Sequence, residues 1–218
     1  MIAKDVGLIE YSKKVDFLNS LTHAAGAVLS VAAMIAMIAR AHDMRHMLSA
    51  VIYGVSLIAV FTVSAVYHGL KSGEKKRIAR LVDHSTVPVL IAGTATPCAL
   101  ITLYNISSAH SLFVLFIGWF CTLFGIFSKL FFFKKARKIT VAVYIVSCVA
   151  MLASVVPIVS QINSDAFGGI LLGNAVYLIG ALFCGLGIKK EAMHVVFHVF
   201  ALAAAAIHFY VVFVYMFI

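Results

Sequence analysis

Long apolar stretches, separated by short polar and charged segments, dominate the pattern along this chain. The apolar positions run continuously rather than alternating with polar ones, which favours membrane-spanning helices over the strands of an outer-membrane barrel. Crossing about 30 Å of hydrocarbon takes roughly 20 helical residues at about 1.5 Å each. The pattern therefore predicts seven spans, at residues 21–40, 48–70, 82–103, 109–130, 140–161, 167–188 and 193–217.

The composition agrees with an all-α integral membrane protein, which we take as a single domain over residues 1–218. Hydrophobic residues make up 63% of the chain, charged residues only 11%, and the mean hydropathy is +1.08. A soluble domain of this length would be far more polar. The first 20 residues lack the short apolar core and small-residue cleavage site of a signal peptide, so the first span is expected to be an uncleaved anchor.

Three prolines and four cysteines lie inside the predicted spans. Pro88, Pro97 and Pro157 are expected to kink their helices or to break local hydrogen bonding. The cysteines occur singly and without paired spacing, so they are expected to pack as small core residues. They are Cys98, Cys121, Cys148 and Cys184.

The basic residues give an orientation. With seven spans, 15 of the 17 Lys and Arg residues fall on the side of the amino terminus, and only Arg40 and Arg45 fall on the other. The positive-inside rule then predicts a cytosolic amino terminus and an external carboxyl terminus. These loops also account for the net charge of +9 by contact with anionic lipid headgroups, so no nucleic-acid partner is needed. The 15 residues are Lys4, Lys13, Lys14, Lys71, Lys75, Lys76, Arg77, Arg80, Lys129, Lys134, Lys135, Arg137, Lys138, Lys189 and Lys190.

Chemistry is concentrated at the predicted cytosolic ends of four spans. His194 and His198 are four residues apart at the start of the last span, so on a helix both imidazoles lie on one face. Ser64 and His68 repeat this spacing at the end of the second span, Asp83 opens the third, and His23 opens the first. Polar side chains are costly in a membrane and tend to mark function. Their common depth favours a metal site built between helices.

The residue types indicate which metal chemistry is expected. His68, His194 and His198 match the three-histidine ligand set of catalytic zinc, which leaves one position for water. Zinc lowers the pKa of that water to about 7. Asp83 could accept its proton, while the Ser64 hydroxyl could orient the water or stabilise an oxyanion. The substrate reaching such a site from within the membrane would be a lipid amide or ester.

Plainer interpretations stay open for each residue. The pair His194 and His198 also suits interhelical hydrogen bonds or an interfacial anchor. His68 also suits a hydrogen bond at a helix interface. Asp83 suits a helix cap, and Ser64 suits close helix packing.

The remaining histidines have plainer expectations. His42 and His46 share the four-residue spacing, but they are expected to lie in a short external loop without a metal. For His23 and His84, a position at the membrane interface is favoured over a role in supporting the metal ligands. His208 is about 15 Å farther along its span than His198, too far to share the metal. His110 is expected to be solvated.

At these residues the chain resembles the progestin and adipoQ receptor family, in its bacterial hemolysin III branch. The motifs that carry the resemblance are Ser64-x-x-x-His68, Asp83 and His194-x-x-x-His198, preceded by Asn19-x-x-Thr22-His23 at the first span. It covers nearly the whole chain and implies a multi-pass protein of the bacterial inner membrane. One departure is Asp16, where the family usually has Glu, so the charge is kept with a shorter reach.

The resemblance also implies roles. In the adiponectin receptors three histidines hold zinc, with Asp and Ser on the zinc-bound water, which implies His68, His194 and His198 as ligands and Asp83 and Ser64 on the water. The site resembles that of alkaline ceramidases, and bacterial members are linked to membrane lipid homeostasis. The name hemolysin is a poor guide, because a secreted pore-former should be soluble before it inserts.

Two functions of different classes follow. The first is a zinc-dependent membrane hydrolase acting on acyl lipids, and the second is a non-enzymatic receptor or regulator in which zinc clamps the bundle. A channel or transporter is disfavoured, because the span centres are poor in ionisable residues and no inverted repeat is evident. A retinal protein would need a Lys in the last span, and a G-protein-coupled receptor would have an external amino terminus. Membrane lipids are the expected partners, and no soluble protein partner is evident.

The charge pattern predicts the topology. Reporter fusions should place residue 1 and the loops near residues 75, 136 and 189 in the cytosol, and the carboxyl terminus outside, because of the asymmetry in Lys and Arg. A carboxyl-terminal fusion that reports a cytosolic location would show that the spans were miscounted.

Overall fold

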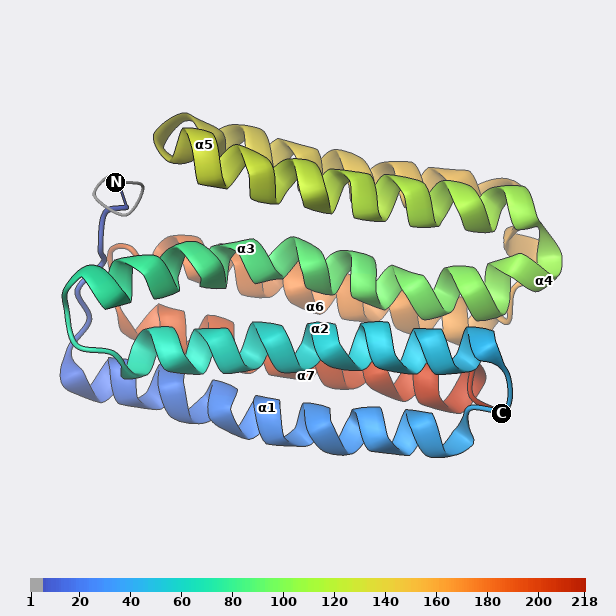
Figure 1. Cartoon of the computed structure of the whole chain (residues 1–218), viewed down its shortest axis with the longest axis horizontal. Helices are drawn as coiled ribbons and strands as arrows, with labels where there is room; N and C mark the ends of the chain where they lie inside the picture. Colours follow the sequence, from blue (N-terminus) through green and yellow to red (C-terminus); the bar gives the residue numbers. More distant parts are fainter. Residues whose placement is uncertain (1–5) are drawn as a thin grey trace.

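The computed structural model describes residues 6–218, apart from the side chains of residues 130 and 132–141, and the described residues form helices and no strand (Figure 1). Five of the charges counted above lie outside the described residues, at Lys4, Lys134, Lys135, Arg137 and Lys138. The helices are α1 (Lys13–Arg40), α2 (Met44–Gly69), α3 (Glu74–Pro97), α4 (Tyr104–Ile106), α5 (Ser108–Val155), α6 (Ser164–Leu186) and α7 (Ala192–Tyr215).

In the part of the chain that the structure describes, seven helical segments are long and apolar enough to cross a membrane, which confirms the predicted all-α fold with seven spans. Two of them, Ser108–Lys129 and Ala142–Gln161, come from α5 and its continuation, and Figure 1 shows the chain doubling back between them. The third span is Glu74–Ile106, which joins α3 to α4. The chain is therefore a multi-pass membrane protein.

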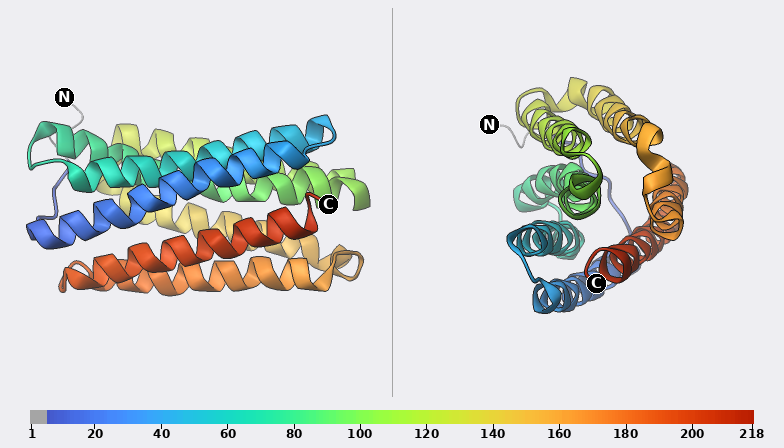
Figure 2. Two further views of the ribbon diagram at one scale, coloured as in Figure 1. Left: turned by 90° about the horizontal axis from the view of Figure 1, so that it is seen from below. Right: turned by 90° about the vertical axis from the view of Figure 1, so that its right-hand side faces the viewer.

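The helices follow one another around an open ring (Figure 2, right). Neighbouring pairs are α1 with α2, α2 with α3 and α3 with α5 on one side, and α1 with α7 and α7 with α6 on the other. In this order α1 contacts both α2 and α7. The starts of α1, α3 and α7 and the end of α2 consequently meet at one end of the bundle, here called the triad end.

Two helices begin about eight residues before the predicted spans. The pattern placed the first and third spans at residues 21 and 82, whereas α1 begins at Lys13 and α3 at Glu74. An apolar window counts only the lipid-facing length, but a helix continues into the polar layer if its first turn is satisfied. For α1 this is done by the Ser12 side chain, which accepts a hydrogen bond from the Val15 N–H at 3.4 Å.

The prolines act in three ways. Pro97 ends α3 and is followed by a π-helical turn at Cys98–Leu103, while Pro157 lies in the 3-10 turn Val156–Gln161. Pro88 lies inside α3 without ending it. Proline lacks the N–H that would bond the carbonyl four residues earlier, here that of His84. The Lys129 ammonium donates to that same carbonyl oxygen, so a side chain of α5 replaces the lost backbone donor.

Small residues allow the helices to approach closely. A Cβ atom at Gly93 would lie 2.1 Å from the Ser56 Oγ of α2, and one at Gly173 would lie 2.2 Å from the His208 Cδ2 of α7. His208 is thereby held against α6, and its Nε2 faces the Ile170 carbonyl oxygen at 3.1 Å. Interfaces between membrane helices commonly use small residues, because packing rather than water exclusion holds the helices together.

Gly173→Ala should destabilise the protein, because the new methyl group would displace His208 from α6 and lengthen its contact with Ile170. We expect a loss of about 1 to 3 kcal/mol, typical of overpacking in a dense interior. Thermal unfolding in detergent would measure it. Gly168→Ala is the matched control in the same helix, since nothing lies within 4 Å of its added Cβ. Equal melting temperatures for both variants would contradict the proposed contact.

Candidate metal centre

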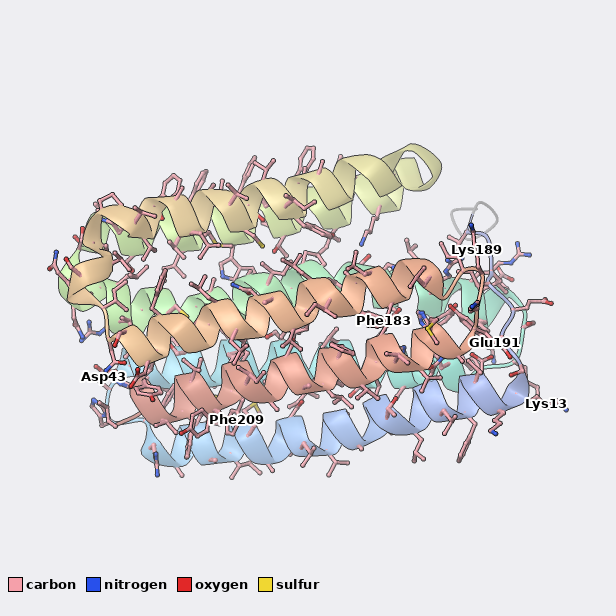
Figure 3. All side chains as sticks on the ribbon, turned by 180° about the vertical axis from the view of Figure 1, so that it is seen from behind. Lys13, Asp43, Phe183, Lys189, Glu191 and Phe209 are labelled. Carbon is pink, nitrogen blue, oxygen red and sulfur yellow. The ribbon has the colours of Figure 1, made fainter. Side chains whose placement is uncertain are left out.

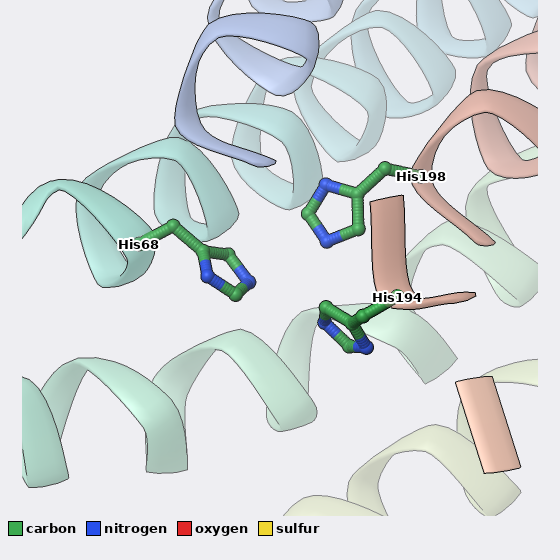
Figure 4. Close-up of side chains that lie close together, drawn as sticks. All are labelled: His68, His194 and His198. Atoms are coloured by element: carbon green, nitrogen blue, oxygen red, sulfur yellow. The ribbon is translucent and has the colours of Figure 1, made fainter. Parts of the chain in front are cut away.

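Three histidines from two helices converge at the triad end (Figure 4). His68 lies in the last turn of α2, and His194 and His198 lie in the first two turns of α7. One ring nitrogen from each lies within 4.8 Å of the others. The ring centroids of His68 and His198, and those of His194 and His198, are 4.9 Å apart. His68 and His198 are buried and His194 is half-buried, so sequence reasoning selected residues that the fold does bring together.

A half-buried carboxylate orients the first of these rings. Asp16, in the first turn of α1, places its Oδ1 2.9 Å from the Nδ1 of His68. Its Oδ2 lies 2.6 Å from the Lys76 Nζ of α3, and the whole Lys76 residue is 3% exposed. Because Nδ1 is engaged, Nε2 is the atom that His68 can offer to a metal. Carboxylates that orient ligand histidines in this way are a common feature of metal sites.

Asp16 and Lys76 are the functional residues that the sequence analysis missed. Asp16 was noted only as a departure with a shorter reach, yet the shorter side chain still contacts His68. Lys76 was counted only among the basic loop residues, yet it is buried and paired with Asp16. Both belong to helical turns added before the predicted spans, so their inward orientation could be recognised only once the true starts of α1 and α3 were known.

A fourth imidazole is stacked on the cluster. The ring of His23 lies 3.7 Å from that of His198 between centroids, at an interplanar angle of 22°. His23 is buried, and neither of its ring nitrogens has a hydrogen-bond partner of normal geometry among the described residues. The favoured interfacial role is therefore replaced by an interior one: His23 supports the face of His198. Asn19 completes this side, with its Nδ2 3.5 Å from the Nδ1 of His68.

Ser64 and Asp83 lie beside the three histidines without joining them as close donors. Ser64 is buried one turn before His68, and its hydroxyl contacts the Asp83 carboxyl group of α3. Asp83 is half-buried, and the positive charges of Lys129 and Arg80 act on it. Its position is compatible with the role proposed from sequence, which is contact with a water molecule rather than with the metal itself.

The segment before α1 covers the cluster. The Tyr11 ring is stacked on that of His194, with centroids 4.9 Å apart and an interplanar angle of 22°. The Ser12 N–H donates to Glu191 Oε2 at 2.6 Å, and Arg80 donates to the Gly7 carbonyl oxygen, which ties the segment to α7 and α3. Burial raises the pKa of the Tyr11 phenol above its ordinary value, so this cover stays neutral at physiological pH.

The donor set fits a borderline transition metal. Three imidazoles suit zinc, and also copper, iron or nickel, better than they suit calcium or magnesium. The Nδ1 atoms of His194 and His198 are buried and have no hydrogen-bond partner of normal geometry among the described residues, so these two nitrogen atoms remain available to an ion. The geometry supports a metal centre and does not select the metal.

The other histidines lie apart from this group. His208 is bound to Ile170 in the middle of the bundle, as its distance along α7 predicted. His110 has its Nδ1 2.8 Å from the Ser107 Oγ, and His84 is exposed on α3. None of the four cysteines, all of which lie in the described part of the chain, forms a disulfide.

His42 lies exposed in the loop before α2, as expected, but His46 differs from expectation. The Asp43 side chain caps α2 by accepting the His46 N–H at 2.8 Å, so the helix begins at Met44. His46 is therefore helical and buried rather than solvated in a loop. Hydrogen bonds from the His46 backbone N–H and ring hold the pKa of Asp43 well below its usual range. Figure 3 shows Asp43 at the opposite end of the bundle from Lys13 and Glu191.

Fold and site together define a multi-pass membrane protein with a buried histidine cluster suited to a metal ion. A family model described as "Haemolysin-III related" matches residues 11–209, and the chain belongs to that family. Hemolysin-3 of Bacillus cereus is 30% identical over 207 residues, which cover 93% of this chain and 92% of the relative. The Hemolysin-3 homolog of Bacillus subtilis (strain 168) is 30% identical over 208 residues, covering 94% and 96%. The Monocyte to macrophage differentiation factor of Homo sapiens is 23% identical over 206 residues, covering 91% and 83%.

Asp16→Asn should weaken metal binding, because it removes the charge that orients His68 and leaves the Lys76 ammonium unpaired. Loss of such an orienting carboxylate typically lowers metal affinity by about 10- to 100-fold. Zinc titration of the purified protein would measure the change. Asp165→Asn is the control, since Asp165 is exposed in the first turn of α6. Unchanged affinity in Asp16→Asn would rule out this role for the contact.

Proposed function

We propose that this protein is a zinc-dependent membrane hydrolase that cleaves the amide or ester bond of an acyl lipid, resembling a ceramidase, and acts in membrane lipid homeostasis. The observation that carries the proposal is the juxtaposition of the three-histidine cluster with the Ser64–Asp83 pair inside an apolar bundle. The metal ligands are His68, His194 and His198. The cluster lies at the end of the bundle that the charge pattern assigns to the cytosolic leaflet.

The residues of the chain divide the work. Zinc bound by the histidines would polarise the scissile carbonyl group and supply a water nucleophile at neutral pH. Asp83 takes the proton of that water on a carboxylate oxygen and returns it to the leaving group. The Ser64 hydroxyl donates to the Asp83 carboxylate and holds it in place. Once Asp83 carries the proton of the water, the Ser64 O–H turns to donate to the developing oxyanion. Lys129 and Arg80 place positive charge near the Asp83 carboxyl group.

Water must be limited in such a site, and the covering segment provides for this. Tyr11 lies over His194 on the side that faces the polar layer. The stacked ring of His23 closes the face of His198 from α1. The lipid would therefore approach from the membrane, where the reacting bond lies near the polar layer and the acyl chain stays in hydrocarbon.

A second candidate is a regulator in which the metal is structural. It is favoured by one observation: His68, His194, Asp16 and Lys76 link four helices, α2, α7, α1 and α3, into one polar network. In this case zinc would fix the arrangement of the triad end and a lipid would be sensed rather than cleaved.

Asp83→Asn separates the two functions, because it keeps the size of the side chain but removes the base. For a hydrolase we expect unchanged zinc content, near one ion at the triad end, and turnover lower by about 10²-fold or more. Ser64→Ala should give a smaller loss. His198→Ala should lose both zinc and turnover. The measurement is hydrolysis of ceramide-like and phospholipid substrates in liposomes, with zinc assayed on the same samples.

His110→Ala serves as the control, since His110 lies on α5 and contacts Ser107. It should match wild type in zinc and in turnover. If wild type shows no turnover above the metal-free protein on any acyl lipid, while Asp83→Asn preserves the membrane phenotype of a deletion strain, the hydrolase must give way to the regulator.

A further inference from the structure

A second group of potential metal donors lies at the opposite end of the bundle. His42, Asp43 and His46 each place one donor atom within 4.8 Å of the other two. Along α2, His46 is 22 positions before His68, which at about 1.5 Å per residue is roughly 33 Å away. This group is therefore independent of the histidine cluster at the triad end, and so is any function it has.

The two ring nitrogens of His46 both face oxygen atoms, one more than a neutral imidazole can donate to. Its Nε2 lies 3.1 Å from the Met216 carbonyl oxygen, and its Nδ1 lies 2.7 Å from the Asp43 Oδ1. A carbonyl oxygen and a carboxylate oxygen can only accept, whereas a neutral imidazole has a single N–H to donate. Whichever ring nitrogen carries that hydrogen, the lone pair of the other one faces an acceptor oxygen. One of the two contacts therefore needs a further proton or a metal ion to become favourable.

His42 favours the metal ion. Its ring centroid is 3.9 Å from that of His46, at an interplanar angle of 41°. A proton shared by His46 and Asp43 does not explain why a second imidazole lies beside them. A metal ion does, because it can bind the His42 ring as a further ligand. Two imidazoles close together also repel one another if both are protonated, but as neutral rings they can share an ion.

The surroundings already orient the ligands. The Met216 carbonyl oxygen lies 3.1 Å from the His46 Nε2 and orients the ring, as an outer partner does in established metal sites. The Arg45 guanidinium lies 3.5 Å from the Asp43 Oδ2 and donates to the Asn105 Oδ1 at 2.9 Å. Because Arg45 contacts Oδ2, the other carboxylate oxygen of Asp43, Oδ1, is the ligand atom. His42 is exposed, so water and ions can reach the group.

The geometry points to a second transition-metal site, formed by His42, Asp43 and His46, that binds zinc or a similar ion such as copper(II) or nickel(II) at the end of the bundle opposite the triad. Two imidazoles and one carboxylate suit these ions, and the remaining positions are filled by water. The ion ties the turn between α1 and α2 to the carboxyl end of α7 through His46 and Met216. Binding therefore stabilises this end of the bundle.

The test is zinc stoichiometry by equilibrium dialysis of the purified full-length protein in detergent. Asp43→Asn is the sharpest variant, because Asn caps a helix as well as Asp does but lacks the charge. His42→Ala removes an exposed ligand that makes no hydrogen bond within the group. We expect either variant to weaken zinc binding at this site by tenfold or more, with the melting temperature in chelator unchanged, and zinc to raise the wild-type melting temperature more than theirs.

Two comparisons make the result decisive. His198→Ala should lose only the zinc bound by His68, His194 and His198, and the site proposed here should remain filled. Zinc binding at the proposed site is therefore expected even if those three histidines hold no metal. His110→Ala, another histidine outside both groups, should leave all binding unchanged. If Asp43→Asn and His42→Ala bind as much zinc as wild type with equal affinity, the cation beside His46 is a proton and the metal site does not exist.

Discussion

A polar group inside a bilayer must find its partner within the protein, and the structure is organised around that constraint. The His84 carbonyl, deprived of its helical donor by Pro88, is bound by Lys129 from α5. His208 bonds the Ile170 carbonyl of α6, and His46 bonds the Met216 carbonyl beyond α7. Each of these contacts joins two helices. Apolar helix surfaces contact lipid as favourably as they contact another helix, so they do not select a partner. Polar residues therefore supply the specificity of helix pairing.

The triad end shows the same constraint applied to charge. Asp16 and Lys76 are opposite charges in close contact, and Lys76 is almost fully buried. A buried ion pair contributes little net stability but is costly to break, which suits a device that fixes geometry rather than one that adds strength. The geometry it fixes is that of His68, through the remaining carboxylate oxygen. A candidate metal ligand is thereby held in one orientation by groups from α1 and α3, although His68 itself belongs to α2.

Much of this could be predicted from sequence, for a definite reason. Hydrocarbon thickness dictates span length, and the helical repeat places residues four apart on one face, so the seven spans and the pairing of His194 with His198 follow from local rules. Local rules do not predict how many helical turns precede the apolar stretch of a span. The extra turns of α1 and α3 contain Asp16 and Lys76, whose burial depends on contacts between helices distant in sequence. The prediction placed His46 in a loop for the same reason. The Asp43 cap lets α2 begin at Met44, before the apolar stretch that defines the predicted span.

The order of the helices around the ring has a consequence for how the protein is made. The histidine cluster takes His68 from the second span but His194 and His198 from the last, and its cover is anchored to Glu191 just before that span. A nascent chain enters the membrane from its amino terminus, so Asp16, Lys76 and His68 can contact one another before His194 and His198 are made. The cluster is complete only when α7 packs beside α1. A chain that lacks its final helix therefore has one of the three histidines, and a metal ion bound by all three would have to be loaded late in biogenesis.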